Sequence, residues 1–342
     1  MKKIVFFYRH SLSFYFSIEK IFNEIAGKIK SSYNNEWSIE EKKIPFASKL
    51  HKIIPNILFA RKYQSEINHV TGDIHYVILG FSKKKLNVLT IHDCVLLHRY
   101  PPQSLRHHII KWLWYDWPSK KADGITVISE ATKNELLHFT KCDPGKIKVI
   151  GNFVDPGFSK CDLTFNTQCP RLLFIGTTPN KNLDRMIDAL EGIESVLDIV
   201  GPLNKEIISK LKAKKIRYED SENLSQEDLV KKYKNCDIVV FPSTYEGFGL
   251  PIIEANAIGR PVLTSNISPM KEVAGNAACL TDCYDSRSIR SGILKIINDV
   301  DYRQSLIQNG FDNTKRFSLE RVTGEYISFY KELLQKKDKT RN

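Results

Sequence analysis

Short apolar runs alternate with longer stretches of helical periodicity along almost the whole chain. Apolar runs bounded by Gly, Pro, Asn or Asp favour buried strands, and their alternation with helical patterns favours parallel sheets covered by helices. In the first half the pattern predicts strands at Lys3–Tyr8, Asp73–Leu79, Asn87–His92, Gly124–Ile128 and Lys146–Ile150. In the second half it predicts strands at Arg171–Ile175, Ser195–Val200, Ile216–Tyr218, Asp237–Phe241, Pro261–Thr264 and Ala278–Leu280. The helices predicted between them include Asn182–Glu191 and Gln226–Lys234.

The length of the chain, 342 residues, is enough for two domains of ordinary size. Hydrophobic residues make up 42% and charged residues 26%, which is typical of a globular protein. No apolar run approaches the roughly 20 residues that a membrane-spanning helix needs. Arg9 and His10 follow the first apolar run too closely for a signal peptide, so we expect that run to be a strand. The loop Asn152–Pro170 is expected to hold the boundary between two α/β domains.

The cysteine pattern and the charge distribution bear on the cellular compartment and on the kind of partner. The seven cysteines include no C-x-x-C pair, which favours free thiols in a reducing cytoplasm over disulfides or a zinc site. The net charge of +12 is uneven, with 24 Lys/Arg against 13 Asp/Glu before residue 151 and 27 against 26 after it. A basic first half suggests an anionic partner there. No nucleic-acid-binding motif is present, so a lipid-linked diphosphate or an anionic membrane surface fits better; a merely solvated Lys-rich surface is an equal alternative.

Two segments of the first half mix cations with large apolar side chains. Pro101–Lys121 holds three Trp and a Tyr among basic residues, and Lys49–Lys62 combines Lys and Arg with Ile and Leu. Such segments can lie in a lipid interface, with rings at headgroup level and cations on phosphates. They can equally be ordinary helices that bury Trp in a core. The sequence leaves both interpretations open.

The most informative stretch is FPSTYEGFGLPIIEANAIGRPVLTSN, residues 241–266. It begins at the end of a predicted strand, and Gly247 and Gly249 allow backbone angles that let a ligand approach the main chain. Pro251 suits the first position of a helix. The backbone N–H groups around Phe248 to Leu250, together with the helix dipole, then form a site for an anion such as a phosphate.

Two carboxylates bracket this turn. Glu254 follows Glu246 by eight positions and falls in the first turn of the predicted helix, so both side chains can face one crevice. One can meet hydroxyls beside the phosphate, and the other can reach a sugar ring. A solvated helix cap is the alternative, in which Glu254 only complements the dipole. The intervening Glu-Gly-Phe-Gly run favours a site.

This segment resembles the donor-binding signature of retaining glycosyltransferases of family 4 (glycosyltransferase group 1), the E-x7-E motif, here Glu246-x7-Glu254. The words CDIVVFPS before it and SPMKEVAG after it fit the same family. The resemblance implies the GT-B fold: two Rossmann-like parallel-sheet domains facing a central cleft, with a C-terminal helix that crosses back to the first domain. The implied domains are residues 1–153 with about 326–342, on the acceptor side, and residues 154–325, which bind the donor.

The resemblance also assigns roles in the second domain. The first Glu, Glu246, contacts the donor sugar and the second, Glu254, binds the ribose hydroxyls, while the amides of Phe248, Gly249 and Leu250 hold the diphosphate. The sequence LLFIGTTPNKNL places Gly176 and Thr177 after a strand and Lys181 where the family has a diphosphate-binding Lys. The Arg that usually accompanies this Lys is absent, because Thr177 and Asn180 occupy its places. Gly201 falls where relatives hold the nucleobase.

In the first domain, His92 ends a predicted strand and matches a family His that contacts the donor sugar. Asp93 either faces the ligand or caps the next turn. Arg9 and His10 follow the first strand and are acceptor-side candidates, because open α/β sheets bind ligands at the carboxyl ends of their strands. Many relatives have a Gly-Gly loop here; this chain instead has Ser11, Ser13 and Ser17, any of which can cap the next helix.

The resulting hypothesis is a metal-independent hexosyltransferase with His92, Glu246 and Lys181 at the reacting centre and no cofactor. The donor would be GDP-mannose or a UDP-hexose, and the acceptor a glycan, expected to be lipid-linked in bacterial surface polysaccharide biosynthesis of the O-antigen or capsule type. The enzyme would be cytoplasmic and peripheral on the inner face of the cytoplasmic membrane. A sugar-nucleotide epimerase on the same fold and a non-catalytic nucleotide-sugar binding protein are the alternatives.

Overall fold

The computed structural model describes residues 1–10, 17–161 and 164–339. The chain forms two compact units, Met1–Asn152 with Leu319–Asn342, and Phe153–Ser318. The first boundary lies one residue before the position expected from the sequence. The return to the first unit lies at Leu319 rather than near residue 326, because the last helix begins there and belongs to that unit from its first residue.

The first unit is built on a six-stranded parallel sheet in the order β2-β1-β3-β4-β5-β6. Its strands are β1 (Lys2–Tyr8), β2 (Trp37–Lys43), β3 (Ile67–Val70), β4 (Leu86–Ile91), β5 (Gly124–Val127) and β6 (Ile147–Val149). Its helices are α1 (Ser17–Ser32), η1 (Leu50–Lys52), α2 (Ile53–Lys62), η2 (His75–Gly80), α3 (Val95–His98), α4 (Leu105–Ile110), η3 (Lys111–Asp116), α5 (Trp117–Lys121), α6 (Glu130–Phe139), η4 (Pro144–Lys146) and α14 (Leu319–Lys339). Ser11 and Ser13, and the side chain of Ser17, lie outside the described residues.

The predicted strand Asp73–Leu79 is wrong. Its apolar residues form the buried 3₁₀ helix η2, and the strand of this part of the chain is β3. A short apolar run does not by its periodicity distinguish a strand from a buried helical turn. The sequence pattern does not predict β3, because the two central residues of this strand, Asn68 and His69, are polar. β2 escaped notice because it is an edge strand with charged residues over most of its length.

The buried polar residues of β3 are satisfied by distant partners. Asn68 donates to the side-chain oxygen of Asn87 at 3.1 Å. The two ring nitrogens of His69 lie 2.6 Å from the Tyr330 hydroxyl and 2.7 Å from the Thr90 hydroxyl. Burial lowers the pKa of His69 to about 3, so the ring stays neutral and one nitrogen donates while the other accepts.

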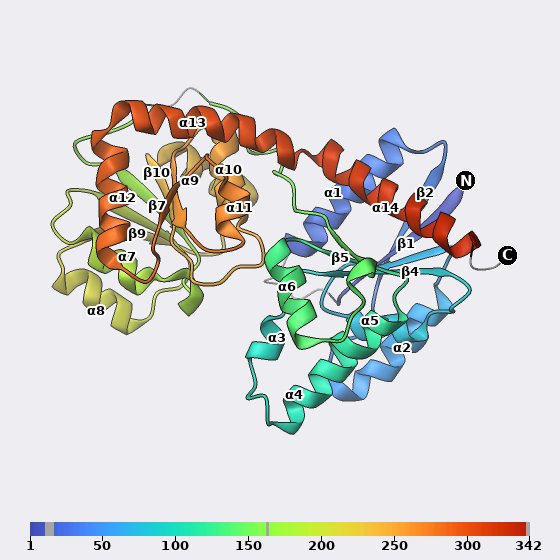
Figure 1. Ribbon diagram of the computed structural model, residues 1–342. Coiled ribbons are helices and arrows are strands. Elements are labelled where there is room, and N and C mark those ends of the chain that lie inside the picture. Colours follow the sequence, from blue (N-terminus) through green and yellow to red (C-terminus); the bar gives the residue numbers. More distant parts are fainter. Residues whose placement is uncertain (11–16, 162–163, 340–342) are drawn as a thin grey trace. The chain divides into compact units, whose positions relative to one another are not determined.

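Helix α14 completes the first unit. Figure 1 shows it beside α1, which it contacts. Tyr330 reaches the centre of the sheet, and the Lys337 ammonium lies 2.6 Å from the Asp123 carboxylate. Gly124 at the start of β5 leaves room for the apolar side of the helix, because a Cβ there would lie 2.5 Å from Leu333.

The second unit repeats the architecture with the strand order β12-β11-β10-β7-β8-β9, all parallel. Its strands are β7 (Arg171–Ile175), β8 (Val196–Val200), β9 (Arg217–Ser221), β10 (Ile238–Phe241), β11 (Val262–Ser265) and β12 (Cys279–Thr281). Its helices are η5 (Pro179–Lys181), α7 (Leu183–Leu190), α8 (Lys205–Ala213), α9 (Gln226–Asn235), α10 (Leu250–Ile258), α11 (Met270–Ala274), α12 (Ser286–Asn298), α13 (Val300–Thr314) and η6 (Lys315–Phe317).

This strand order is that of a dinucleotide-binding sheet. Successive strands are added toward one edge of the sheet from β7 to β9 and toward the other edge from β10 to β12, so the strand order reverses between β7 and β10. Open α/β sheets bind ligands outside the carboxyl ends of the strands at such a reversal. In the first unit the reversal lies between β1 and β3. Across the described ranges, no helix is both long and apolar enough to cross a membrane.

Replacing Gly124 with alanine should destabilise the protein by about 1–3 kcal/mol, because overpacking forces α14 away from β5. The new Cβ would lie 2.5 Å from Leu333 and 2.7 Å from Phe329. Gly27→Ala in α1 is the matched control, since a Cβ there meets no atom within 4 Å outside its own helix backbone. It should raise stability by about 0.5–1 kcal/mol. Urea unfolding measures both, and equal free energies of unfolding for the two variants would contradict this packing.

Candidate active site

The loops that follow β7 and β10 lie side by side at the reversal of the second sheet. β7 and β10 are hydrogen-bonded neighbours, so the segments after Ile175 and Phe241 leave the same edge. Backbone bonding joins them, because the Thr244 N–H donates to the Asn180 carbonyl at 2.8 Å. The Asn180 side chain donates to the Tyr245 carbonyl at 2.9 Å. The two loops therefore form one surface.

Lys181 and Glu246 meet on this surface. The Lys181 ammonium lies 2.7 Å from Glu246 Oε1, and the side chains are only 20% and 14% exposed. Lys181 Nζ also lies 4.8 Å from the centre of the Phe241 ring. The sequence picked out these residues from separate motifs, and the structure brings them into one ion pair. An anionic ligand bound to Lys181 would therefore interact with an ammonium group that is also paired with the Glu246 carboxylate.

Gly176 allows the Lys181 side chain to take this path. Its φ is +84°, and a Cβ on it would lie 2.9 Å from Lys181 Cε. The next residue, Thr177, donates from its hydroxyl to the Pro202 carbonyl at 2.7 Å. Gly201 sits against Thr177, since a Cβ there would lie 3.0 Å from its hydroxyl oxygen. One connected patch of the surface is thus formed by Gly176, Thr177, Lys181 and Gly201.

The helix that starts beyond Glu246 supplies the expected amide groups. Gly249 precedes α10 with φ +110°, in the left-handed region that favours glycine, and Leu250 is the first helical residue. The first N–H groups of an α-helix have no partner inside the helix. Phe248 is buried and packs edge-on against Phe317, with ring centres 5.6 Å apart. Its side chain therefore anchors the turn, and only its backbone is placed to meet a ligand.

Glu254 lies in the second turn of α10, not in the first as expected, because the helix begins at Leu250. The Tyr233 hydroxyl donates to Glu254 Oε2 at 2.5 Å. Burial, reinforced by the Glu254 charge, raises the pKa of Tyr233 well above its usual range, so the hydroxyl keeps its proton and acts as donor. This bond fixes the direction of the carboxylate.

Two residues that build the site were not predicted from the sequence. Asn182 adopts a left-handed conformation with φ +70°. Its amide donates to the Pro242 carbonyl at 2.9 Å and to the Cys283 carbonyl at 2.7 Å, which ties three segments together. Arg185 lies one turn further along, and its guanidinium donates to Asn182 Oδ1 at 3.0 Å. Asn182 follows the predicted Lys181 directly, and this adjacency is the one sequence feature that could have pointed to it.

The first-unit candidates lie at the edge of the other sheet. The His92 ring donates from Nε2 to the Thr71 carbonyl at 2.8 Å, because a carbonyl oxygen can only accept. Asp93 Oδ1 accepts from the Val95 N–H at 3.0 Å, which is the capping role that the sequence allowed as an alternative. Burial, together with the charge of Asp73, raises the pKa of Asp93.

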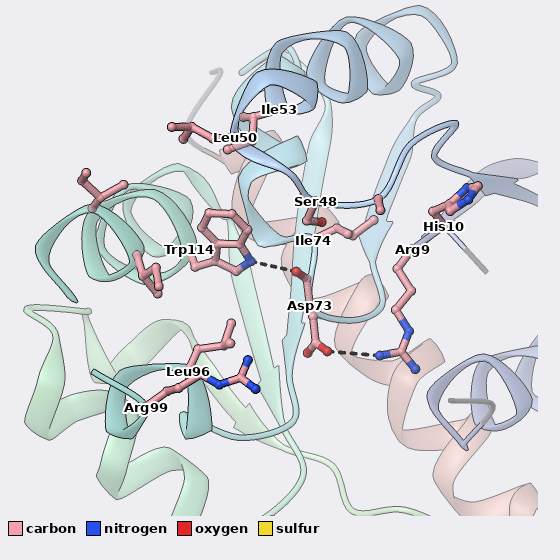
Figure 2. A pocket seen from close by; sticks show the side chains of 13 residues that line it. Arg9, His10, Ser48, Leu50, Ile53, Asp73, Ile74, Leu96, Arg99 and Trp114 are labelled. Atoms are coloured by element: carbon pink, nitrogen blue, oxygen red, sulfur yellow. Dashed lines mark hydrogen bonds and ion pairs between the residues drawn. The ribbon is translucent and has the colours of Figure 1, made fainter. Parts of the chain in front are cut away.

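Arg9 and His10 line a cavity of about 470 Å³ in the first unit. Figure 2 shows the Arg9 guanidinium turned toward Asp73, at 3.2 Å. The same guanidinium contacts Glu19 at 2.6 Å and 3.1 Å, so two carboxylates offset its charge. Trp114 closes another side through a 2.8 Å bond from its indole N–H to the Asp73 carbonyl.

The chain contains one Asp-x-Asp sequence, Asp299-Val300-Asp301, a pattern that can signal a metal site. Here Asp299 caps α13 by accepting from the Tyr302 N–H at 2.9 Å. Over residues 1–10, 17–161 and 164–339, no group of three or more His, Cys, Asp or Glu side chains could hold a metal ion. Metal independence remains a prediction.

Known proteins resemble the chain over different shares of its length. The uncharacterized glycosyltransferase MJ1178 of Methanocaldococcus jannaschii is 26% identical over 261 residues, which span 72% of this chain and 70% of that protein. The O-antigen chain mannosyltransferase B of Escherichia coli is 40% identical over 105 residues, 31% of this chain but only 28% of that enzyme.

Two solved structures share the fold. Sucrose-phosphate synthase from Thermosynechococcus elongatus matches with a TM-score of 0.79 at 15% identity, over 98% of this chain and 100% of that one. HepE from Anabaena, solved with UDP and glucose, matches with a TM-score of 0.77 at 16% identity, over 97% and 100%. These matches confirm the predicted GT-B fold class.

Two family models match successive parts of the chain. The model described as Glycosyltransferase Family 4 matches residues 40–158, and the model described as Glycosyl transferases group 1 matches residues 159–313. Together they cover residues 40–313 without a gap. The chain therefore belongs to the family 4, group 1 glycosyltransferases.

Proposed function

We propose that the chain transfers a hexose from a nucleotide-diphosphate sugar to a hydroxyl of a glycan acceptor, with retention at the anomeric carbon. The observation that carries the proposal is the 2.7 Å pair of Lys181 and Glu246, four residues before α10 begins. A cation, a carboxylate and a helix N-terminus at the reversal of a parallel sheet suit a diphosphate with an attached sugar.

Each group has a proposed task. Lys181, Gly176, Thr177 and the amides of residues 248–250 hold the diphosphate. Glu246 orients the sugar hydroxyls. Glu254, directed by Tyr233, accepts hydrogen bonds from the ribose, and Gly201 borders the base. For His92 we propose the donor-sugar contact that the family resemblance implies.

In the reaction, the bond from the anomeric carbon to the phosphate oxygen breaks, and the acceptor oxygen bonds to that carbon on the same face. The acceptor proton passes to the leaving phosphate, so no enzyme nucleophile is needed. Lys181 and the helix N-terminus stabilise the negative charge that develops on the diphosphate, and such electrostatic stabilisation usually contributes most to catalysis. We propose that no metal or cofactor takes part.

The relatives support two donor classes. Resemblance to a mannosyltransferase favours GDP-mannose, and resemblance to a structure with UDP and glucose favours a UDP-hexose. The O-antigen relative also supports a lipid-linked glycan of a bacterial surface polysaccharide as acceptor. We propose a cytoplasmic enzyme, peripheral on the membrane that holds this acceptor.

An epimerase on this fold would convert the donor without an acceptor, and a binding protein would convert nothing. Nucleotide release from GDP-mannose and from UDP-hexoses, followed with and without glycan acceptor and in EDTA, separates the three. Release that needs acceptor and persists in EDTA is the expected result. Epimerised donor, or no release with any donor, would contradict the proposal.

Lys181→Met and Glu246→Gln should each lower turnover about 100-fold or more, because each removes transition-state stabilisation. Each single variant also leaves a part-buried charge unpaired, which should cost about 1–3 kcal/mol of stability. The double variant removes both charges and should regain stability without regaining activity. Urea unfolding and initial-rate assays measure the two effects. A double variant that recovers activity along with stability would show the pair to be structural only.

Gly176→Ala should abolish nucleotide binding, because the new Cβ displaces the Lys181 side chain. Gly192→Ala is its control: φ is +72° there, so the backbone strain is similar, but no atom lies within 4 Å of the new Cβ. Both variants should lose about 1–2 kcal/mol of stability to strain. Calorimetric titration with the best nucleotide should distinguish them. Equal affinity in both variants would mean that the path of Lys181 over Gly176 is unimportant for binding.

A further inference from the structure

The helical segment η1–α2 carries an exposed apolar stripe. Leu50, Ile54 and Leu58 recur every four residues and are between 57% and 71% exposed. This spacing places them on one side of the helix. Ile53 and Ala60 on the opposite side are buried in the core of the first unit. The stripe is therefore an outer face, not a strained part of the core.

A second exposed stripe runs along α4, η3 and α5. Leu105, Ile109 and Trp112 follow each other at helical spacing, and Trp117 comes next; all four are between 38% and 75% exposed. η3 is a π-helix, and the Trp117 N–H bonds the carbonyl of Trp112, five residues back. The wider turn stacks the two indoles, with ring centres 4.5 Å apart. These seven side chains are here named the apolar-basic face: Leu50, Ile54, Leu58, Leu105, Ile109, Trp112 and Trp117.

The charged residues of these two segments are mostly cations. Residues 44–63 and 94–115 contain no Asp or Glu. The next carboxylate, Asp116, is paired with Lys111 at 2.6 Å. The cations of the two segments are Lys49, Lys52, Arg61, Lys62, Arg99, Arg106 and Lys111, with His51, His98, His107 and His108 among them. Exposed leucine and tryptophan amid an excess of cations complement an anionic surface that has an apolar interior.

Both stripes border the first-unit cavity. Its lining includes Leu50, Ile53, Ile109, Ile110 and Trp114. Figure 2 shows Leu50, Ile53 and Trp114 around it. Arg99 also lines it. Since Leu50 and Ile109 are both exposed, the apolar-basic face forms part of the cavity's outer rim. A molecule held in the cavity would emerge beside whatever covers this face.

We propose that the apolar-basic face docks on the surface of an anionic lipid bilayer, with the leucine and tryptophan side chains in the interface and the surrounding cations on lipid phosphates. It specifies the surface for the peripheral association in the proposed function, and rests on that function only in expecting a lipid-linked acceptor. Docking would set the cavity against the bilayer, where such an acceptor resides.

Vesicle flotation of the full chain, without donor or acceptor, tests the proposal. Binding is expected to vesicles of phosphatidylcholine with added phosphatidylglycerol, to weaken with salt, and to be at least about tenfold poorer with phosphatidylcholine alone. Because no transfer is measured, failure here would leave glycosyl transfer intact. Failure of transfer alone would leave the docking surface intact.

Matched variants locate the surface. Ile54→Ser/Leu58→Ser should weaken binding at least about tenfold, since each buried apolar side chain contributes to partitioning. Val300→Ser, which changes a 54% exposed residue of the second unit, should leave it unchanged. Arg61→Gln/Lys62→Gln should weaken binding about fivefold for each charge removed, whereas Lys205→Gln/Lys212→Gln on α8 should have little effect.

Fluorescence gives a direct position. Trp37 and Trp114 are buried, whereas Trp112 and Trp117 are exposed, so brominated lipids should quench wild type strongly and Trp112→Phe/Trp117→Phe weakly. Three results would overturn the proposal: no preference for anionic vesicles, full binding by Ile54→Ser/Leu58→Ser, or self-association that this variant abolishes in the absence of vesicle binding. The last result would assign the face to a second copy of the chain.

Discussion

Two asparagines hold the loops on which the site of the second unit depends. Asn180 bonds the Tyr245 carbonyl, and Asn182 bonds the carbonyls of Pro242 and Cys283. These bonds fix the segment after β7 against the segment after β10. Lys181 stands between the two asparagines and is therefore delivered to Glu246 at 2.7 Å. The two side chains are part-buried. Without these hydrogen bonds the loops could separate, and each charged group would then be solvated instead of paired.

The same hydrogen bonds involve the two positions at which the family resemblance leads us to expect an arginine. Thr177 and Asn180, which occupy the arginine's places, form hydrogen bonds to Pro202 and Tyr245 that join neighbouring loops. These two side chains therefore join neighbouring loops and add no positive charge. The proposed anion site then relies on Lys181, on the N-terminus of α10 and on the nearby guanidinium of Arg185.

How far the sequence could anticipate this differs between the units. In the second unit the strands are apolar and the motif residues adjacent, so the sheet and the placement of Lys181 and Glu246 were predicted. The pairing of those two side chains was not, because it depends on hydrogen bonds across about 65 positions of sequence. In the first unit β3 was missed because His69 is polar, and its partner Tyr330 lies 261 positions away. Trp112 is exposed and Trp114 is buried within the π-helix η3. The hydrophobic periodicity of the sequence does not predict this π-helix, so it did not predict which of the two indoles is exposed.

The proposed function requires the second unit to bind a nucleotide-diphosphate sugar at the reversal between β7 and β10. The most direct test is the thermal unfolding of the wild-type chain with GDP, UDP, GDP-mannose and the common UDP-hexoses, because a ligand that binds only the folded state raises the unfolding temperature. We expect a clear rise with one base, GDP or UDP, and with its sugar conjugates. An unchanged unfolding temperature with every nucleotide at millimolar concentration would contradict the claim.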